Sequence, residues 1–332
     1  MNTQTETAVT EKSISVDELK KRKPLKPGKI SWKKDFKRNW VVYVIFIPVF
    51  LYMIFVHYLP MFGIIMSFQN FSLTKGIFGS PFNGLENFIT LFTGDAFLNA
   101  LRNTVILGLF NLTIGFAAPV LFALLITSVP YKRFRRAMQT ICYLPNFVAS
   151  VVVVTLMQNF LSENGAITNL LTTFGLERQD WLANPNPPAF WLIYTFMAVW
   201  QGFGYGSIIF VSSISNISGD LYEAAAIDGA NRWQQVRKIT FPCILPMVVM
   251  LFVIQVAVVF KAGYDKILLM YTPSTRGVAD TLYTYTYRLS FGESRPNYGV
   301  SAASGLFQSV VSTVLLFGSN WISRKVTNLA VF

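Results

Sequence analysis

The sequence predicts an all-α integral membrane protein with six transmembrane helices. Of the 332 residues, 53% are hydrophobic and only 13% are charged, whereas soluble domains have about 25% charged residues. The mean hydropathy is +0.45, with 30 Phe, 14 Tyr and 7 Trp. A bilayer core about 30 Å thick requires about 20 apolar helical residues. Segments of that kind lie at 40–68, 101–128, 138–161, 189–214, 244–270 and 302–323.

The distribution of basic residues predicts the orientation of these spans. Segments 1–39, 129–137, 215–243 and 324–332 carry 11, 4, 3 and 2 lysine and arginine residues, which is 20 of the 28. Because cytoplasmic segments are enriched in these residues, both termini are expected in the cytoplasm. The net charge of +12 therefore reflects membrane orientation, and nucleic acid is not an expected partner. The expected domains are a basic tail (1–39), a six-span domain (40–323) and a second tail (324–332).

Proline and small residues shape the first two spans. The first span contains Pro48 and Pro60, and each removes an amide donor, so this helix is expected to be kinked or tilted. The second span contains Gly108, Gly115 and Pro119. Such residues often mark close helix packing in membranes.

Segment 215–243, between the fourth and fifth spans, is expected to fold as two short helices at the cytoplasmic membrane surface. Asp220 is a candidate N-cap, with Glu223 three residues later as in a capping box. Gly229 can end the first helix in the left-handed conformation. The second helix is expected over 232–239, with Pro242 ending it. Small side chains at 224–226 permit close approach of a partner, to which Glu223 and Asp228 present charge.

The pattern of this loop resembles the EAA loop of binding-protein-dependent ABC importer permeases. The matching residues are Glu223, Ala224, Ala225, Gly229, Ile239 and Pro242, and Phe241 replaces the usual leucine. The resemblance extends over roughly 40–325. Other stretches are similar to carbohydrate-uptake permeases of the LplB type, namely 143–148 with 161–162 and Gly165, 80–82 with 84–88, and 298–299 with 305–307.

The resemblance implies a type I importer permease in the bacterial cell membrane. Residues 220–242 would form the helix that couples the permease to a cytosolic ATPase. The implied partners are a second homologous permease subunit, two ATPase copies, an extracellular substrate-binding protein, membrane lipid and an oligosaccharide or polysaccharide fragment. ATP and Mg would be used by the ATPase, and no cofactor by this chain.

Several kinds of chemistry are not predicted. No G-x-x-x-x-G-K-[ST] phosphate loop is present, since Gly28-Lys29 is followed by Ile30. The single histidine, His57, lies in the first span and is interpreted as a packed residue. Cys142 and Cys243 lack metal-ligand spacing and are interpreted as packing residues. The chain is therefore expected to be a non-catalytic subunit without catalytic or metal-binding residues.

Polar residues inside spans are candidates for the substrate pathway, because burying them in lipid is costly. Aromatic faces beside amides and carboxylates suit sugars, which have apolar C–H faces and hydroxyl groups. Lys261 and Asp265 have an alternative interpretation as a pair one helical turn apart. Tyr283, Tyr285 and Tyr287 are expected at the outer interface or against the binding protein. The pathway candidates are Gln158, Asn159, Trp200, Gln201, Tyr205, Gln255, Lys261, Tyr264 and Asp265.

Two other functional classes were weighed against this prediction. Gly204-Tyr205-Gly206 superficially resembles an element of a potassium-channel filter, although here it falls within a predicted span. A proton-coupled secondary carrier is the second alternative, but it would have no need of the docking loop.

Overall fold

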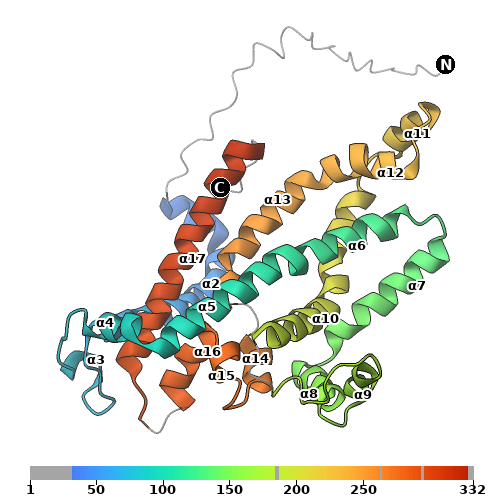
Figure 1. The fold of residues 1–332 in the computed structure, drawn as a ribbon. Helices are drawn as coiled ribbons and strands as arrows, with labels where there is room; N and C mark the ends of the chain where they lie inside the picture. Colours follow the sequence, from blue (N-terminus) through green and yellow to red (C-terminus); the bar gives the residue numbers. More distant parts are fainter. Residues whose placement is uncertain (1–31, 184–186, 262–263, 293–294, 328–332) are drawn as a thin grey trace, which may run out of the picture. The chain divides into compact units, whose positions relative to one another are not determined.

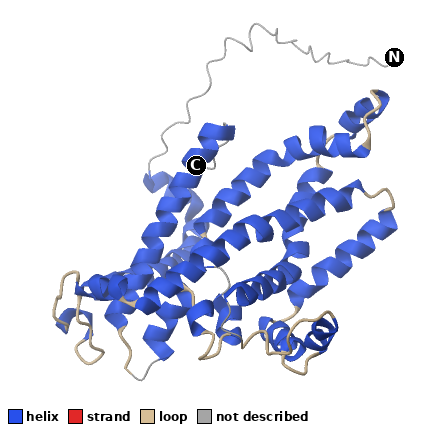
Figure 2. Ribbon diagram, in the orientation of Figure 1, coloured by secondary structure: helices blue, strands red, loops and turns tan. Residues whose placement is uncertain are grey.

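The computed structural model describes residues 32–183, 187–261, 264–292 and 295–327. Within these residues the regular elements are helices, and the one β-bridge joins Gln69 and Phe82 (Figures 1 and 2). The chain divides into two compact units, Met1–Phe62 and Gly63–Phe332. In the described residues, five helices are long and apolar enough to cross a membrane, or six if one bent pair counts as a span. The predicted all-α membrane class is therefore confirmed.

The first unit contains the first candidate span, Asp35–Phe68, which continues into the second unit. Helix α2 (Trp32–Tyr52) includes Pro48 and has non-helical angles at Asn39. It passes into the π-helical turn η1 (Met53–Tyr58) and the 3₁₀ segment η2 (Leu59–Phe68), which contains Pro60. The helical hydrogen bonding therefore changes from α to π and then to 3₁₀ between Pro48 and Pro60, while the expected kink or tilt stays a prediction. Residues 1–31, most of the predicted tail, lie outside the described residues.

The second and third spans differ in continuity. The second is a single helix from Asp95 to Ser128, formed by α5 (Asp95–Phe110), η3 (Asn111–Gly115) and α6 (Phe116–Ser128). The third is bent by 94°. It consists of α7 (Lys132–Tyr143), η4 (Leu144–Phe147), α8 (Ser150–Leu161) and α9 (Ala166–Thr173).

The predicted third span, 138–161, is not one continuous helix, because the chain leaves helical geometry in the middle of it. Pro145 lies in η4 and has no amide donor, and Val148 is extended. The carbonyl of Val148 is satisfied by the side chain of Gln201, whose Nε2 donates to it at 2.8 Å. The bend is thus stabilised by a contact from another helix.

The fourth span is helix α10 (Pro187–Ser215). The fifth follows the loop and runs continuously from Arg232 to Ala257. It consists of α12 (Arg232–Gln235), η5 (Val236–Thr240) and α13 (Phe241–Ala257). Pro242 is predicted to end the second loop helix, and this prediction is wrong, because the helix continues past it. The π-helical turn η5 directly before it shifts the hydrogen-bond register, so the helix continues despite the missing amide.

The predicted fifth span, 244–270, also extends too far. Helix α13 ends at Ala257, and Val258 has φ −99° and ψ 5°. Two short helices follow, η6 (Val259–Lys261) and α14 (Tyr264–Met270). Ile267 and Met270 are at most 1% exposed because they pack in a protein core with residues of α8 and α10. The segment is apolar because it is buried in protein, and it does not continue the span.

The remaining elements are the sixth span and the segments that connect spans. Helix α17 (Tyr298–Thr327) contains the sixth candidate span, Tyr298–Lys325. The connecting elements gather at the end of the second unit opposite α11 (Figure 1). They are α3 (Gly76–Gly79), α4 (Glu86–Thr93), α15 (Arg276–Ala279), α16 (Leu282–Tyr287) and η7 (Arg288–Gly292).

Three hydrophobic clusters hold the second unit together. One joins α8, α10, α14 and α15 around Phe190 and Met197, and another joins α4, α5, α16 and α17 around Phe97. The third joins α6, α10 and α13 around Ile244. Helix α10 also packs closely on the end of α7. A Cβ atom at Gly204 would lie 1.9 Å from the Cys142 carbonyl oxygen, so only glycine fits there.

Candidate functional site

The loop between α10 and α13 projects from the end of the second unit as a short helix and a tight turn (Figure 1). Helix α11 (Gly219–Ile227) has nine residues, too few for a stable helix in water by itself. Its N-cap is Ser218, whose Oγ accepts from the amide of Asp220 at 3.3 Å. The prediction of Asp220 as N-cap is therefore wrong. Ser218 is the last residue with non-helical angles, and Asp220 lies in the first turn, where its charge favours the helix dipole.

The end of α11 is closed by a Schellman motif. The amide of Ala230 donates to the Ala225 carbonyl at 2.9 Å, and the amide of Gly229 donates to that of Ala226 at 3.1 Å. Gly229 has φ 77°, which a residue with a side chain rarely adopts. The predicted left-handed glycine is therefore present.

The chain is tied on both sides of this turn. Asn231 and Gln234 form a capping box at the start of α12. The Tyr222 hydroxyl lies 2.9 Å from that of Thr240, and Arg232 Nη1 donates to the carbonyl of Ser128 at 2.9 Å. The first of these contacts ties α11 to η5, and the second ties α12 to the end of α6.

The structure brings several predicted coupling residues together. Ala225, Asp228, Gly229 and Ile239 line one hollow of about 330 Å³ between α11 and η5. Glu223 and Ala224 are exposed on α11, and Pro242 is exposed in the first turn of α13.

Two further residues of the loop were missed by sequence reasoning. Ile227 is 87% exposed and Trp233 is 68% exposed. Exposed large apolar side chains beside charged ones are typical of protein contact surfaces. The signal available in the sequence was an isoleucine and a tryptophan on either side of a predicted turn.

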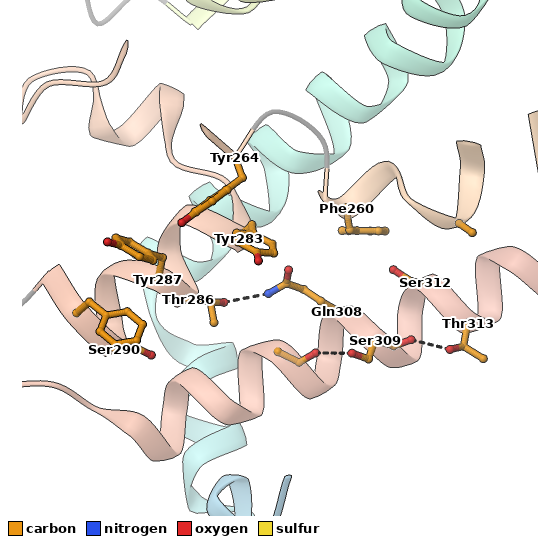
Figure 3. Close-up of a pocket in the computed structure, with 13 residues that line it drawn as sticks. Phe260, Tyr264, Tyr283, Thr286, Tyr287, Ser290, Gln308, Ser309, Ser312 and Thr313 are labelled. Carbon is orange, nitrogen blue, oxygen red and sulfur yellow. Dashed lines mark hydrogen bonds between the residues drawn. The ribbon is translucent and has the colours of Figure 1, made fainter. Parts of the chain in front are cut away.

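A second candidate site is a cavity of about 560 Å³ between α16, η7 and α17 (Figure 3). Tyr264, Tyr283 and Tyr287 contribute adjacent aromatic rings. The ring centroid of Tyr264 lies 4.4 Å from that of Tyr283 and 5.8 Å from that of Tyr287. Phe291 extends the aromatic wall, with its centroid 5.3 Å from that of Tyr287.

The opposite wall of this cavity is polar. It is formed by Gln308, Ser309, Ser312 and Thr313 of α17, which reach the middle of the candidate span Tyr298–Lys325. Gln308 Nε2 donates to Thr286 Oγ1 at 2.9 Å, and the amide group points toward the tyrosines (Figure 3). The hydroxyls of Ser309 and Thr313 donate to carbonyls within α17, and their oxygen atoms can still accept. Aromatic rings facing hydroxyl and amide groups can hold a polyhydroxylated ring.

Of the predicted pathway residues whose side chains the structure describes, only Tyr264 lines this cavity. The cavity wall also contains Tyr283 and Tyr287, which are predicted to lie at the outer interface or against the binding protein. Tyr285 is buried, 6% exposed, with its ring centroid 6.1 Å from that of Phe97. Alternation along α16 explains the difference, since neighbouring residues of a helix point in different directions.

The other predicted pathway residues are scattered over the second unit. Gln158 donates to the Leu269 carbonyl at 3.1 Å and Asp265 accepts from Ser150 Oγ at 2.7 Å, so both join α8 to α14. Gln255 donates to Asn111 Oδ1 at 3.1 Å. Asn159 is exposed. The side chain of Lys261 lies outside the described part of the structure.

Two predicted aromatic candidates lie on α10, away from this cavity. Trp200 is 38% exposed, and Tyr205 is 50% exposed with its ring against that of Phe147. Gln201, between them, is buried and satisfies the bend at Val148, as described above.

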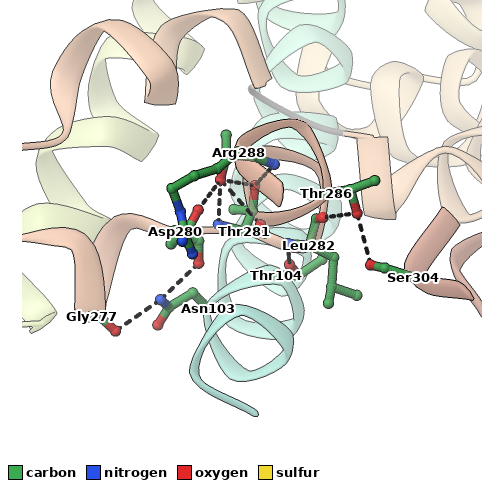
Figure 4. A network of polar contacts seen from close by, with 10 residues as sticks. Asn103, Thr104, Gly277, Asp280, Thr281, Leu282, Thr286, Arg288 and Ser304 are labelled. Atoms are coloured by element: carbon green, nitrogen blue, oxygen red, sulfur yellow. Dashed lines mark hydrogen bonds and ion pairs between the residues drawn. The ribbon is translucent and has the colours of Figure 1, made fainter. Parts of the chain in front are cut away.

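A buried polar network holds the segment that carries the tyrosines (Figure 4). Asp280 and Arg288 form an ion pair at 2.8 Å, with both side chains at most 10% exposed. Asn103 Nδ2 of α5 donates to the Asp280 carbonyl at 2.9 Å, and Thr104 Oγ1 accepts from the Leu282 amide at 2.8 Å. No local sequence pattern indicates this network, because Asn103 and Arg288 are 185 positions apart.

Comparison with known proteins adds independent findings. The family described as "Binding-protein-dependent transport system inner membrane component" matches residues 115–328. Protein LplB of Bacillus subtilis (strain 168) is 32% identical over 306 residues, which cover 91% of this chain and 94% of LplB. The polygalacturonan/rhamnogalacturonan transport system permease protein YteP of the same organism is 33% identical, over 86% of this chain and 88% of YteP.

A solved structure has the same fold. It is a chain of a bacterial alginate ABC transporter, in complex with an alginate pentasaccharide-bound periplasmic protein. The TM-score is 0.82 at 36% identity, and the match covers 90% of this chain and 99% of that one.

Proposed function

Because this chain belongs to the family of binding-protein-dependent transport system inner membrane components, we propose that it is the translocation subunit of an ATP-driven importer of an oligosaccharide or polysaccharide fragment. The observation that carries the proposal is the exposed α11 helix, fixed by caps and cross-contacts at the end of two spans (Figure 1). Such an element transmits force only if a partner binds it. The polysaccharide and oligosaccharide transport systems of YteP and the alginate transporter support the solute class.

The proposed mechanism is alternating access. Two ATPase copies close when ATP and Mg bind, and α11 passes the motion to α10 and α13. These helices then shift between inward-open and outward-open arrangements, as in other two-state elements biased by a ligand. A second homologous permease subunit would complete the pathway, and an extracellular binding protein would deliver the solute. This chain would perform no hydrolysis.

The solute is proposed to pass the aromatic cavity beside α17. A sugar ring presents C–H faces that can stack on Tyr264, Tyr283 or Tyr287, and hydroxyls that can pair with Gln308 and the α17 hydroxyls. The α17 side of the cavity, residues 308–313, lies halfway along the sixth candidate span, which supports a solute site reached from within the membrane.

The geometry of α10 disfavours the channel alternative. Gly204-Tyr205-Gly206 lies within the continuous helix Pro187–Ser215, where backbone carbonyls are engaged in helical hydrogen bonds. A selectivity filter needs those carbonyls to face a pore. The glycine at 204 instead permits contact with the Cys142 carbonyl.

The test is the variant Glu223→Ala in the assembled transporter. Glu223 is exposed, so the free energy of unfolding should change by less than about 0.5 kcal/mol. ATP-driven uptake into proteoliposomes should fall about tenfold or more if Glu223 contacts the ATPase. The matched control is Asp220→Ala, which removes an exposed carboxylate from the same helix one turn earlier and should retain most of the uptake.

Two outcomes would contradict the proposal. Normal uptake by Glu223→Ala would reject the coupling role of this residue. Purification of the chain from its native membrane without an associated ATPase, together with ion flux through the purified chain alone, would reject the importer class.

A further inference from the structure

A cavity of about 450 Å³ lies between the membrane helices and the loop, and nothing in the transport mechanism uses it. Its lining comes from the end of α6, the first turns of α7, the end of α10, and the segment from α11 to η5. Lys132, Arg135 and Arg232 all contribute to this lining. Three cations from two distant parts of the chain thus face one space.

The positive charge of this cavity is not balanced by the described part of the chain. No aspartate or glutamate lines the cavity, and none of its three cations forms an ion pair among the described residues. Arg135 is half-buried, and the hydrogen bond of Arg232 to the Ser128 carbonyl fixes one side of its guanidinium group. Lys132 and Arg232 are exposed, but cations that line one space repel one another and favour an anion that bridges them.

The position of the cavity indicates which anion can reach it. Three candidate spans have one terminus at the wall of this cavity. Two of them end there, at Ser128 and Ser215, and the third begins there, at Arg232. Ends of spans lie at the depth of the lipid headgroups. Helix α7 also exposes Phe134 and Ile141, seven residues apart, and these offer an apolar surface to acyl chains.

We propose that this cavity binds a phosphate group, and that the phosphate belongs to the headgroup of an anionic phospholipid. Basic pockets between membrane helices are suited to anionic headgroups, and a guanidinium group pairs well with phosphate oxygens. Tyr222 and Thr240 in the same lining share one hydrogen bond at 2.9 Å, so the hydroxyl that accepts in that pair can donate to a phosphate oxygen. The site goes beyond the transport function and does not depend on the solute carried.

A bound headgroup would join two separate elements of the protein. It would contact α7 through Lys132 and Arg135, and the loop through Arg232, which lies just after the turn at Gly229. The lipid would therefore stabilise one relative position of α7 and the coupling loop.

The chain provides a matched pair of variants for the test. The double variant Lys132→Gln with Arg135→Gln removes two cations from the cavity. Arg133→Gln with Arg136→Gln removes two cations from the same helix, but these residues line a different, shallow surface with Thr140 and Ile141. The probe is phosphatidylglycerol, titrated against the full-length chain in neutral detergent and measured by native mass spectrometry. Phosphatidylcholine and millimolar sodium phosphate are the comparison ligands.

The cavity double variant should bind phosphatidylglycerol about 30-fold more weakly, because each cation contributes about 1 kcal/mol near a headgroup. The control double variant should lose less than about threefold. Arg232→Gln, on a separate element, should lose about fivefold, so the site can be tested even if the α7 variants fold poorly.

Three results would overturn the proposal. The first is an equal loss of phosphatidylglycerol affinity in the two double variants. The second is a wild-type affinity for phosphatidylcholine equal to that for phosphatidylglycerol. The third is weaker ATPase binding by the cavity variants with unchanged lipid binding, which would assign the cavity to a protein partner. Binding of sodium phosphate with the same dependence on the variants, but no binding of the lipid, would keep the phosphate site and reject the lipid as its source.

Discussion

At the scale of single residues, the aromatic cavity depends on ring surfaces that the chain brings together from three elements. Tyr264 precedes the other members by about 20 positions, and the rings of Tyr283 and Tyr287 flank it only after folding. Both of these tyrosines are nearly 40% exposed, so they contribute more to the cavity wall than to the core. Substitution there should change solute handling with little effect on folding.

Replacing Tyr283 with alanine should raise the KM of uptake about three- to tenfold, because stacking on one aromatic ring contributes about 0.5–1.5 kcal/mol. Tyr283→Phe keeps the ring and should change KM less than twofold. Uptake of the binding protein's own solute into proteoliposomes measures both values. Equal impairment of the two variants would show that the ring is not the contacting group.

The buried ion pair between Asp280 and Arg288, unlike the exposed tyrosines, is expected to matter for stability. Both side chains are almost inaccessible, and Asp280 also accepts from Thr284 Oγ1. Arg288→Met should destabilise the protein by about 3–5 kcal/mol, since it leaves a buried carboxylate without its partner.

The double variant Asp280→Asn with Arg288→Met provides the control for that change. It removes both charges and should recover part of the lost stability, as judged by thermal unfolding in detergent. A double variant less stable than Arg288→Met alone would contradict the view that the unpaired charge is the cause.

At the scale of elements, the loop shows how short helices are held without a core of their own. Helix α11 depends on its Ser218 cap, the Schellman motif and the contact between Tyr222 and Thr240. The turn at Gly229 joins α11 to the fifth span, so under the proposed mechanism it would set the direction in which α11 transmits motion.

Gly229→Val should add about 1–2 kcal/mol of strain, because a side chain at positive φ clashes with the backbone. Hydrogen exchange of the α11 amides should become faster, and ATP-driven uptake should fall. Gly229→Asn is the matched control, since asparagine tolerates the left-handed conformation. If the valine and asparagine variants behave alike, the conformation of the turn does not limit coupling.

At the scale of the whole molecule, the uneven distribution of lysine and arginine predicts which ends face the cytoplasm. That prediction can be tested at two highly exposed positions on different connecting segments of the second unit. Ile227, in the loop, is 87% exposed, and Phe78, between the first two spans, is 102% exposed.

Single-cysteine variants at these positions should report opposite sides of the membrane, in a chain whose Cys142 and Cys243 are replaced by serine. A membrane-impermeant maleimide added to right-side-out vesicles should label Phe78→Cys at once and Ile227→Cys only after permeabilisation. The reverse order of labelling would place the loop outside the cell and exclude contact with a cytosolic ATPase.

The sequence by itself determined the membrane class, the approximate positions of most spans and the short helical loop between the fourth and fifth spans. These features depend on local composition and spacing, such as apolar length, the clustering of basic residues, and a glycine placed to end a helix. Gly229 could be read from the sequence because a tight helix end has the same local requirement in any fold.

Tertiary structure decided the features that depend on distant contacts. The runs 138–161 and 244–270 were apolar enough to be predicted as spans. Only the fold shows that Gln201 satisfies a bend in the first, and that Ile267 and Met270 are buried in protein in the second. Hydrophobicity records that a side chain avoids water, but it does not record whether lipid or protein replaces the water. The aromatic cavity and the ion pair of Asp280 with Arg288 are decided in the same way, by which segments meet.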